Sequence, residues 1–436
     1  MGQYALMKTR RFLPLFMTQF LGSFNDNMFR SALAVMITYQ FTSGPISWLT
    51  AGVMVALCST LLVIPFPILS PIAGQLADKY DKAKLIKWIK LSEIIIMSLA
   101  AYGFIHGEIY LLMGLLFMTG VHSAFFGPIK NSILSDHLSE KELLPGNSLI
   151  AGGTYASVLA GLILGGLLVE HDKGGELIGY VLAGGAILGF IASRFILPTQ
   201  PASAELKINY HVVREAITII GQVRTNRPVI LSILGLSWFL LIAAVFMGQF
   251  PTFAKAVGGD NEVYTLFLVI FSLGISLGSL MCNRLLKGEI SAKFTPVAAF
   301  FISLFIIAMV ISAPAPTNHL MGAWEFIEHA KHWPMMLFML GIAVAGGVYI
   351  VPLYTIMQAK AEVEFRSRII AARNVINSAF ITLAMLISAG LLAIGLDVFE
   401  LSIIIALLNL GVVARSCKLL PELPNNALAT IRGITG

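Results

Sequence analysis

The stretch "GQLADKYDKAK", Gly74–Lys84, places five charged side chains between two long apolar runs. Its residues fit the pattern G-x-L-x-D-[RK]-x-x-[RK], with Gly74, Asp78, Lys79 and Lys82 at the defining positions. A glycine lets two helices approach closely, and an acid at a helix end can bind donors of a neighbouring helix. The pattern therefore favours a specific contact between helices, whereas a solvated charged loop is the alternative interpretation.

Apolar runs like the two that flank this loop recur along the whole chain. Of 436 residues, 57% are hydrophobic and 12% are charged, whereas globular domains are about 25% charged. A run of about 20 apolar residues is long enough to cross a bilayer as a helix. The sequence therefore predicts an all-α integral membrane protein. Twelve spans are expected, at about 12–41, 47–72, 84–105, 108–132, 146–170, 177–197, 228–256, 262–286, 292–313, 333–358, 369–395 and 398–417.

The basic residues test this count. All but four of the 29 Lys and Arg residues fall on one side if the spans alternate. The exceptions are Arg30, inside the first span, and Lys173, Lys255 and Lys331 in loops on the other side. Because Lys and Arg concentrate in cytoplasmic loops, the pattern predicts an even number of spans with both termini in the cytoplasm.

A second, altered copy of the loop pattern divides the chain into halves. "GSLMCNRLLKG", Gly278–Gly288, follows the eighth span as Gly74–Lys84 follows the second, and Cys282 stands in the place of Asp78. Repeated halves are common in transporter folds. We therefore predict two six-helix bundles with pseudo-two-fold symmetry.

A long polar connection separates the halves. It covers residues 198–227 and begins with a proline. We predict a first bundle over 1–197, a cytoplasmic linker over 198–227 and a second bundle over 228–436. Within the linker, 208–224 has the pattern of an amphipathic helix at the inner membrane surface.

The first span holds four polar residues in "FNDNMFR", Phe24–Arg30. Asp26 and Arg30 are four residues apart and share one helix face, whereas Asn25 and Asn27 point to other faces and can bond neighbouring helices. Ionisable residues inside spans usually face a bundle interior or a water-filled cavity. We therefore expect Asp26 to line a polar cavity. The alternative is an Asp26–Arg30 pair that satisfies itself, or a pair with another span.

Further polar residues lie in other spans. Lys130, near the inner end of the fourth span, either attracts an anionic group or extends to the membrane surface. Asn374 and Asn377 are three residues apart and share a face of the eleventh span, where interhelical hydrogen bonding is the alternative to a cavity role. Glu93, in the third span, is expected to pair with Lys90 or with a basic group elsewhere.

Four stretches of the sequence indicate a particular transporter family. "FLPLFMTQFLGSFNDNMFRSAL", "GQLADKYDKAKLIKWIKLSEI", "FFGPIKNSILSDHLSEKELLPGNSLI" and "RIIAARNVINSAF" together resemble the bacterial lysophospholipid transporter family of the major facilitator superfamily. The first three lie in the N-terminal half, where the match is best. Asp81 stands where the superfamily usually has a glycine. In many relatives the transporter is fused to an acyltransferase and an acyl-carrier-protein synthetase.

This resemblance implies a secondary transporter of the bacterial inner membrane. It would flip lysophospholipids inward for re-acylation, by alternating access with lateral entry of the lipid. Arg30 would hold the phosphate and Asp26 the ammonium of a lysophosphatidylethanolamine head group, with Asn25, Asn27, Lys130, Asn374 and Asn377 as further cavity residues. Gly74, Asp78, Lys79 and Lys82 would form the inner gate.

Other functions remain open at this stage. A proton-coupled facilitator of a drug or siderophore would use Asp26 as its proton site, and a scaffold that recruits an acyltransferase is a third possibility. No enzyme activity is expected, because none of the eight histidines opens an H-x4-D acyltransferase signature. Re-acylation would therefore need separate acyltransferase or synthetase partners. We expect no cofactor, no metal and no nucleic-acid partner.

Overall fold

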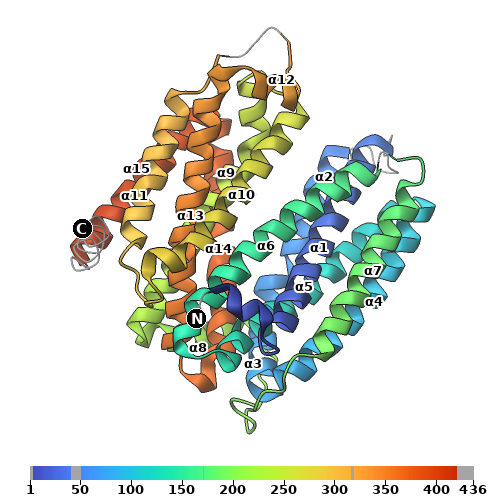
Figure 1. The fold of residues 1–436 in the computed structure, drawn as a ribbon, viewed down its shortest axis with the longest axis vertical. Helices are drawn as coiled ribbons and strands as arrows, with labels where there is room; N and C mark the ends of the chain where they lie inside the picture. Colours follow the sequence, from blue (N-terminus) through green and yellow to red (C-terminus); the bar gives the residue numbers. More distant parts are fainter. Residues whose placement is uncertain (1–2, 41–50, 170, 316–318, 420–436) are drawn as a thin grey trace. The chain divides into compact units, whose positions relative to one another are not determined.

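A computed structural model describes residues 3–40, 51–169, 171–315 and 319–419, and these residues are almost entirely helical (Figure 1). The described residues contain no β-strand, only an isolated bridge between Gly259 and Met321. The predicted all-α architecture is therefore confirmed.

The first half of the chain forms α1 to α7. Their bounds are Leu13–Gln40, Ala51–Val63, Pro65–Lys79, Lys82–His106, Ile109–His137, Glu140–Val169 and Gly174–Arg194. A 3-10 helix, Gln3–Lys8, precedes them. The second predicted span is divided into α2 and α3, because Pro65 begins a new helix after Ile64 and has no backbone N–H to continue the old one.

The second half forms α8 to α15. Their bounds are Val212–Thr225, Arg227–Ala256, Asn261–Leu286, Thr295–Ile311, Ala323–Glu328, Trp333–Lys360, Arg366–Ala393 and Val398–Leu419, with 3-10 helices at Ala330–His332 and Val363–Phe365. The amphipathic helix predicted in the linker is α8.

Many of these helices suit a bilayer by length and composition. Among the described residues, 10 helices are long and apolar enough to cross a membrane. The shorter apolar helix α11 has 17 residues, and α1 has 28 residues but carries Asp26 and Arg30. The chain is therefore a multi-pass membrane protein, and the count of twelve spans stays a prediction.

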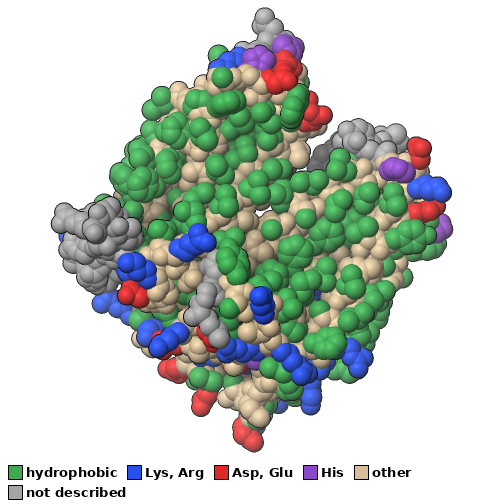
Figure 2. All heavy atoms as spheres, in the orientation of Figure 1, with side chains coloured by type: hydrophobic (Ala, Val, Ile, Leu, Met, Phe, Trp, Pro, Cys, Tyr) green, Lys and Arg blue, Asp and Glu red, His purple; other side chains and the backbone are tan. Residues whose placement is uncertain are grey.

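The surface also fits a bilayer. Large apolar side chains are exposed on helix after helix, for example Trp88 (70%), Leu188 (57%) and Leu386 (67%). Figure 2 shows hydrophobic side chains covering the flanks of the helices, while most of the visible Lys and Arg side chains lie in the lower part of the view. In water an apolar surface of this extent would drive association, whereas in lipid it is solvated.

The helices divide into two compact units. Unit 1 contains residues 1–146, 156–230 and 358–375, so it takes the beginning of α14 from the second half of the chain. Within it, α4 and α1 pack on α7, and α3 and α4 pack on α5. Its apolar core includes Phe29 of α1, whose ring meets that of Phe104 of α4 edge-on at 5.5 Å.

Two glycines of α6 bring that helix against α1 within unit 1. A Cβ at Gly161 would lie 2.5 Å from the carbonyl oxygen of Phe24, and one at Gly165 would lie 2.5 Å from that of Met28. The G-x-x-x-G spacing thus allows backbone-to-backbone packing that no larger residue permits. This contact holds α1, which carries Asp26, in its place.

Unit 2 contains residues 147–155, 231–357 and 376–436. Its interior is rich in aromatic rings, and Phe250 lies edge-on to Phe271 at 5.5 Å. Trp238 of α9 donates to Asn409 of α15 at 2.8 Å, so the one polar group of the indole is satisfied.

Candidate functional site

Asp26 joins α1 to α5 in unit 1. Its Oδ2 accepts a hydrogen bond from Ser123 Oγ at 2.7 Å. Its Oδ1 is buried and has no hydrogen-bond partner in the part of the chain that the structure describes. A buried carboxylate oxygen normally accepts hydrogen bonds. Asp26 therefore has an acceptor available for a donor that the described residues do not supply.

Lys130 lies on α5, two turns beyond Ser123. Its Nζ is 5.5 Å from the centre of the Phe126 ring, and it interacts electrostatically with Asp26 and with Arg373 of α14. Lys130 is partly exposed. An acid with an unfilled oxygen and a base thus lie near one another in unit 1. That pairing could receive a ligand that carries both charges.

Arg30 and Asn27 interact with each other. Arg30 Nη2 donates to Asn27 Oδ1 at 3.3 Å, and Asn27 Nδ2 donates to the backbone carbonyl of Ser23 at 2.8 Å. Both residues are partly exposed, like Asp26. The hydrogen bonds described for Asn27 thus stay within α1, although the sequence suggested that it bonds a neighbouring helix.

Asn25 faces the interior of unit 1. It is fully buried, and its Nδ2 donates to the backbone carbonyl of Leu182 in α7 at 3.2 Å and to Glu93 Oε1 in α4 at 3.4 Å. A Cβ on Gly185 would lie 2.5 Å from Asn25 Oδ1, so a glycine is needed opposite this amide. Asn25 bonds neighbouring helices, as the sequence suggested.

An ion pair is buried beside Asn25. Lys90 Nζ lies 2.5 Å from Glu93 Oε2, and both residues are almost completely inaccessible to solvent. His122 Nε2 lies 3.5 Å from the same carboxylate oxygen, and a Cβ on Gly22 would lie 2.5 Å from Lys90 Nζ. Glu93 pairs with the residue three positions before it, which is one of the partners expected for it. The pair links α4 to α1 and α5.

Asn374 and Asn377 of α14 bond different parts of the protein. Asn374 Nδ2 donates to Ser70 Oγ of α3 at 3.1 Å within unit 1, and its Oδ1 accepts from Arg373 at 2.7 Å. Asn377 belongs to unit 2, where its Oδ1 accepts from Ser237 Oγ of α9. Interhelical hydrogen bonding, the alternative to a cavity role, therefore describes both amides.

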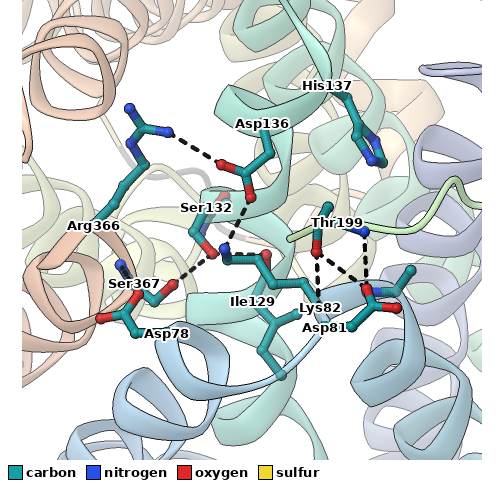
Figure 3. A network of polar contacts seen from close by, with 12 residues as sticks. Asp78, Asp81, Lys82, Ile129, Ser132, Asp136, His137, Thr199, Arg366 and Ser367 are labelled. Carbon is teal, nitrogen blue, oxygen red and sulfur yellow. Dashed lines mark hydrogen bonds and ion pairs between the residues drawn. The ribbon is translucent and has the colours of Figure 1, made fainter. Parts of the chain in front are cut away.

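The end of α3 contacts the beginning of α14 within unit 1 (Figure 3). Asp78 is fully buried; its Oδ1 accepts from the backbone N–H of Ser367 at 3.0 Å. Its Oδ2 accepts from the backbone N–H of Arg368 at 3.3 Å and from Arg368 Nε at 3.0 Å. An acid at a helix N-terminus satisfies free N–H groups and is favoured by the helix dipole. The buried charge of Asp78 is thus compensated both by the backbone N–H groups at the start of α14 and by the guanidinium of Arg368.

Gly74 makes this approach possible. A Cβ there would lie 2.9 Å from Ala371 Cβ and 3.0 Å from the backbone of Arg368 and Ser367. Any larger residue would have to push α14 away from α3.

A second acid joins three helices at the same place (Figure 3). Asp136, at the end of α5, lies 2.9 Å from Lys82 Nζ of α4 and 3.2 Å from Arg366 Nη1 of α14. Ser367 Oγ donates to Ser132 Oγ at 2.9 Å beside them. Of the four motif residues, Lys79 alone has its described contact elsewhere, with its Nζ 5.7 Å from the Tyr80 ring.

Asp81, the departure from the usual glycine, stabilises the turn in another way. Its Oδ1 accepts from the backbone N–H of Ala83, which caps α4, and from the N–H and hydroxyl of Thr199 in the linker, at 3.0 and 3.1 Å. An aspartate is a good residue at the start of a helix. The substitution thus ties the linker to the motif.

Sequence reasoning missed Asp136, Arg366 and Arg368. The two arginines belong to a group of basic residues between two predicted spans, and Asp136 ends "SILSD" after an apolar run. An acid just after one span and bases just before another could have indicated an ion pair between span ends. The sequence does not say which span ends are adjacent.

A sequence model of the Major Facilitator Superfamily matches residues 15–385. The chain belongs to the Major Facilitator Superfamily. Solved structures of other transporters are similar to this chain in fold. The human organic anion transporter MFSD10 superposes with a TM-score of 0.71 over 93% of this chain and 99% of that one, at 11% identity. A bacterial homologue of the iron transporter ferroportin, in an outward-facing state, superposes with a TM-score of 0.63 over 95% and 99%, at 15% identity.

Curated superfamily members are similar in sequence. The lysophospholipid transporter LplT of Pectobacterium carotovorum subsp. carotovorum (strain PC1) is 24% identical over 365 residues, which are 81% of this chain and 79% of that protein. LplT of Citrobacter koseri is 23% identical over 394 residues, 87% and 89% of the two chains. The resemblance predicted from four stretches of the sequence is therefore confirmed.

Proposed function

We propose that this protein is a secondary transporter that moves lysophospholipids inward across the bacterial inner membrane. The observation that carries the proposal is the buried Oδ1 of Asp26, which has no hydrogen-bond partner among the described residues, in a carboxylate that also interacts electrostatically with Lys130. A lysophosphatidylethanolamine head group carries an ammonium and a phosphate. The ammonium would donate to Asp26 Oδ1, and the phosphate would lie near Lys130 and Arg30. The name of the LplT relatives supports this substrate class.

The proposed transport cycle uses alternating access. Twelve helices would form two six-helix bundles, 1–197 and 228–436, joined by the linker 198–227, with both termini in the cytoplasm. The bonds of Asp78 to the beginning of α14 would form the closed inner gate, which must separate for a lipid head group to leave inward. The acyl chain would remain in the bilayer throughout, so the lipid enters sideways. No covalent bond changes in this cycle, and any re-acylation falls to separate enzymes.

Uptake by purified protein in liposomes tests the proposal. Labelled lysophosphatidylethanolamine is added outside, and its appearance in the inner leaflet is followed with and without an imposed proton gradient. We expect saturable inward movement that exceeds the rate in protein-free liposomes. Equal rates with and without protein would refute the proposal. Uptake of a soluble zwitterion instead, abolished when the gradient is collapsed, would favour a proton-coupled facilitator.

A further inference from the structure

Helix α8 leads directly into the apolar helix α9. It ends at Thr225, and α9 begins only two residues later at Arg227. Since α9 is long and apolar enough to cross the membrane, the end of α8 is fixed at the point where the chain enters the bilayer. Asn226, between the two helices, also donates to the backbone carbonyl of Lys360 at the end of α13, at 3.0 Å.

One face of α8 packs on α3, within unit 1, and the opposite flank is apolar as well. Glu215, Ile219 and Val223, spaced four apart, are buried, and α8 contacts α3. Val213 and Ile217, also four apart, are 73% and 66% exposed. Exposed apolar side chains at this spacing form a stripe along the helix. Nothing in the described part of the chain covers that stripe.

The charges on the exposed side of α8 are basic. Arg214 and Arg224 are exposed, whereas Glu215, the one acid of the helix, is buried and accepts from Asn209 Nδ2 at 3.2 Å. An apolar flank bordered by arginines is typical of helices that lie in the headgroup region of an anionic leaflet. The occupant that fits is therefore the bilayer, with Val213 and Ile217 in its apolar boundary and the arginines on its phosphates.

The linker connects α8 to the motif at the end of α3. Asn209 and Gln75 exchange two hydrogen bonds, at 2.7 Å from Asn209 N and 3.0 Å to Asn209 O. The backbone N–H of Ser203 donates to the carbonyl of Asp78 at 2.8 Å. Gln75 and Asp78 are three residues apart on α3, so the linker and α14 both bind the same helical turn. A movement of α8 would therefore change the position of this turn and the hydrogen bonds of Asp78 with α14.

We propose that α8 is a docking surface for the anionic lipid headgroups of the inner leaflet, and that this docking stabilises the contacts of Asp78 with α14. The lipid concerned is the bulk bilayer and not the transported molecule. The docking itself is independent of the proposed transport function, whereas its meaning as control of an inner gate rests on that function. Anionic lipid would thus favour the closed inner gate.

Hydrogen–deuterium exchange of the full chain in lipid nanodiscs tests both steps. Nanodiscs of phosphatidylcholine alone are compared with nanodiscs that also contain phosphatidylglycerol. Two sets of backbone amides are followed. The first set is that of α8. The second is the amides of Ser367 and Arg368, which donate hydrogen bonds to the Asp78 carboxylate. We expect phosphatidylglycerol to slow exchange roughly tenfold in both sets, as the attraction of two arginines to an anionic surface implies.

A matched pair of variants separates the lipid face from the rest of α8. The combined change Val213→Ser, Ile217→Ser, Arg214→Gln and Arg224→Gln should abolish the effect of phosphatidylglycerol in both sets. Thr225→Ser changes an exposed residue while keeping its hydroxyl, and should preserve the effect. Equal protection of α8 in the two lipids would overturn the docking and leave a protein partner or water on this flank. Slower exchange in α8 without slower exchange at Ser367 and Arg368 would overturn the proposal that docking stabilises the Asp78 contacts. No lysophospholipid is present, so neither result depends on transport.

Discussion

Asp78 and Arg368 are 290 residues apart, yet the carboxylate of Asp78 accepts from both the backbone amide and the guanidinium of Arg368. The carboxylate is completely buried. A buried charge is tolerated only when it is compensated, and removal of its partner leaves a large penalty. This contact therefore joins two segments that are far apart in the sequence, and removal of one partner alone should be costly.

Asp78→Asn should weaken the contact of α3 with α14. The amide keeps one acceptor but loses the charge, and hydrogen bonds to charged groups contribute about 1.5–3 kcal/mol. We expect the contact between α3 and α14 to open roughly 10- to 100-fold more often. A cysteine at the buried Ser132, in a background without the native cysteines, would report opening through its rate of labelling by a water-soluble maleimide.

Lys79→Gln is the matched control for Asp78→Asn. It removes a neighbouring charge whose described contact is the Tyr80 ring, so labelling should stay at the wild-type rate. If Asp78→Asn also labelled at that rate, the contact would have no role in closing this end.

The helical membrane fold could be predicted because its signals are local. The apolar runs and the Gly74–Lys84 pattern each lie within a few turns of one helix, where periodicity determines which residues share a face. The Lys90–Glu93 pair was foreseeable for the same reason, because three residues make almost one turn.

The partners that lie far apart in the sequence could not be predicted. Asp136 meets Arg366 across 230 residues, and His122 approaches Glu93 from another helix. Such contacts depend on which helices pack together and at what rotation, and hydropathy does not encode that. The same holds for Asn374 and Asn377: their spacing places them on one face, but their hydrogen bonds go to different units.

Asp26→Asn should reduce lysophospholipid uptake by at least about tenfold. The amide can still accept from Ser123 Oγ, so the fold should persist, but the charge that would bind an ammonium is lost, at about 1.5–3 kcal/mol. Uptake of labelled lysophosphatidylethanolamine into liposomes measures the effect. Glu108→Gln removes an exposed acid that caps no helix through its side chain and should transport normally. Normal uptake by Asp26→Asn would show that the charge of Asp26 does not bind the substrate.

Glu93→Gln should destabilise the protein strongly. It leaves the fully buried Lys90 without its counter-charge, and breaking a buried ion pair in this way costs about 3–5 kcal/mol. Thermal unfolding, followed by size-exclusion chromatography of the detergent-solubilised protein, would show a lower midpoint. The double change Lys90→Met and Glu93→Leu should recover much of the loss, because neither charge of the pair then stays buried. A double variant no more stable than Glu93→Gln would mean that the pair itself is needed.

Gly161→Ala should loosen α6 from α1. The new methyl would lie 2.5 Å from the carbonyl oxygen of Phe24, so the helices must separate, and overpacking of this kind typically costs about 1–3 kcal/mol. Gly184→Ala is the matched control, because a Cβ there meets nothing within 4 Å and alanine favours a helix over glycine by about 1 kcal/mol. We expect the unfolding midpoint to fall for Gly161→Ala and to stay or rise for Gly184→Ala. Because α1 carries Asp26, uptake should fall with the first change and persist with the second. Equal midpoints in the two variants would show that α6 does not need its close approach to α1.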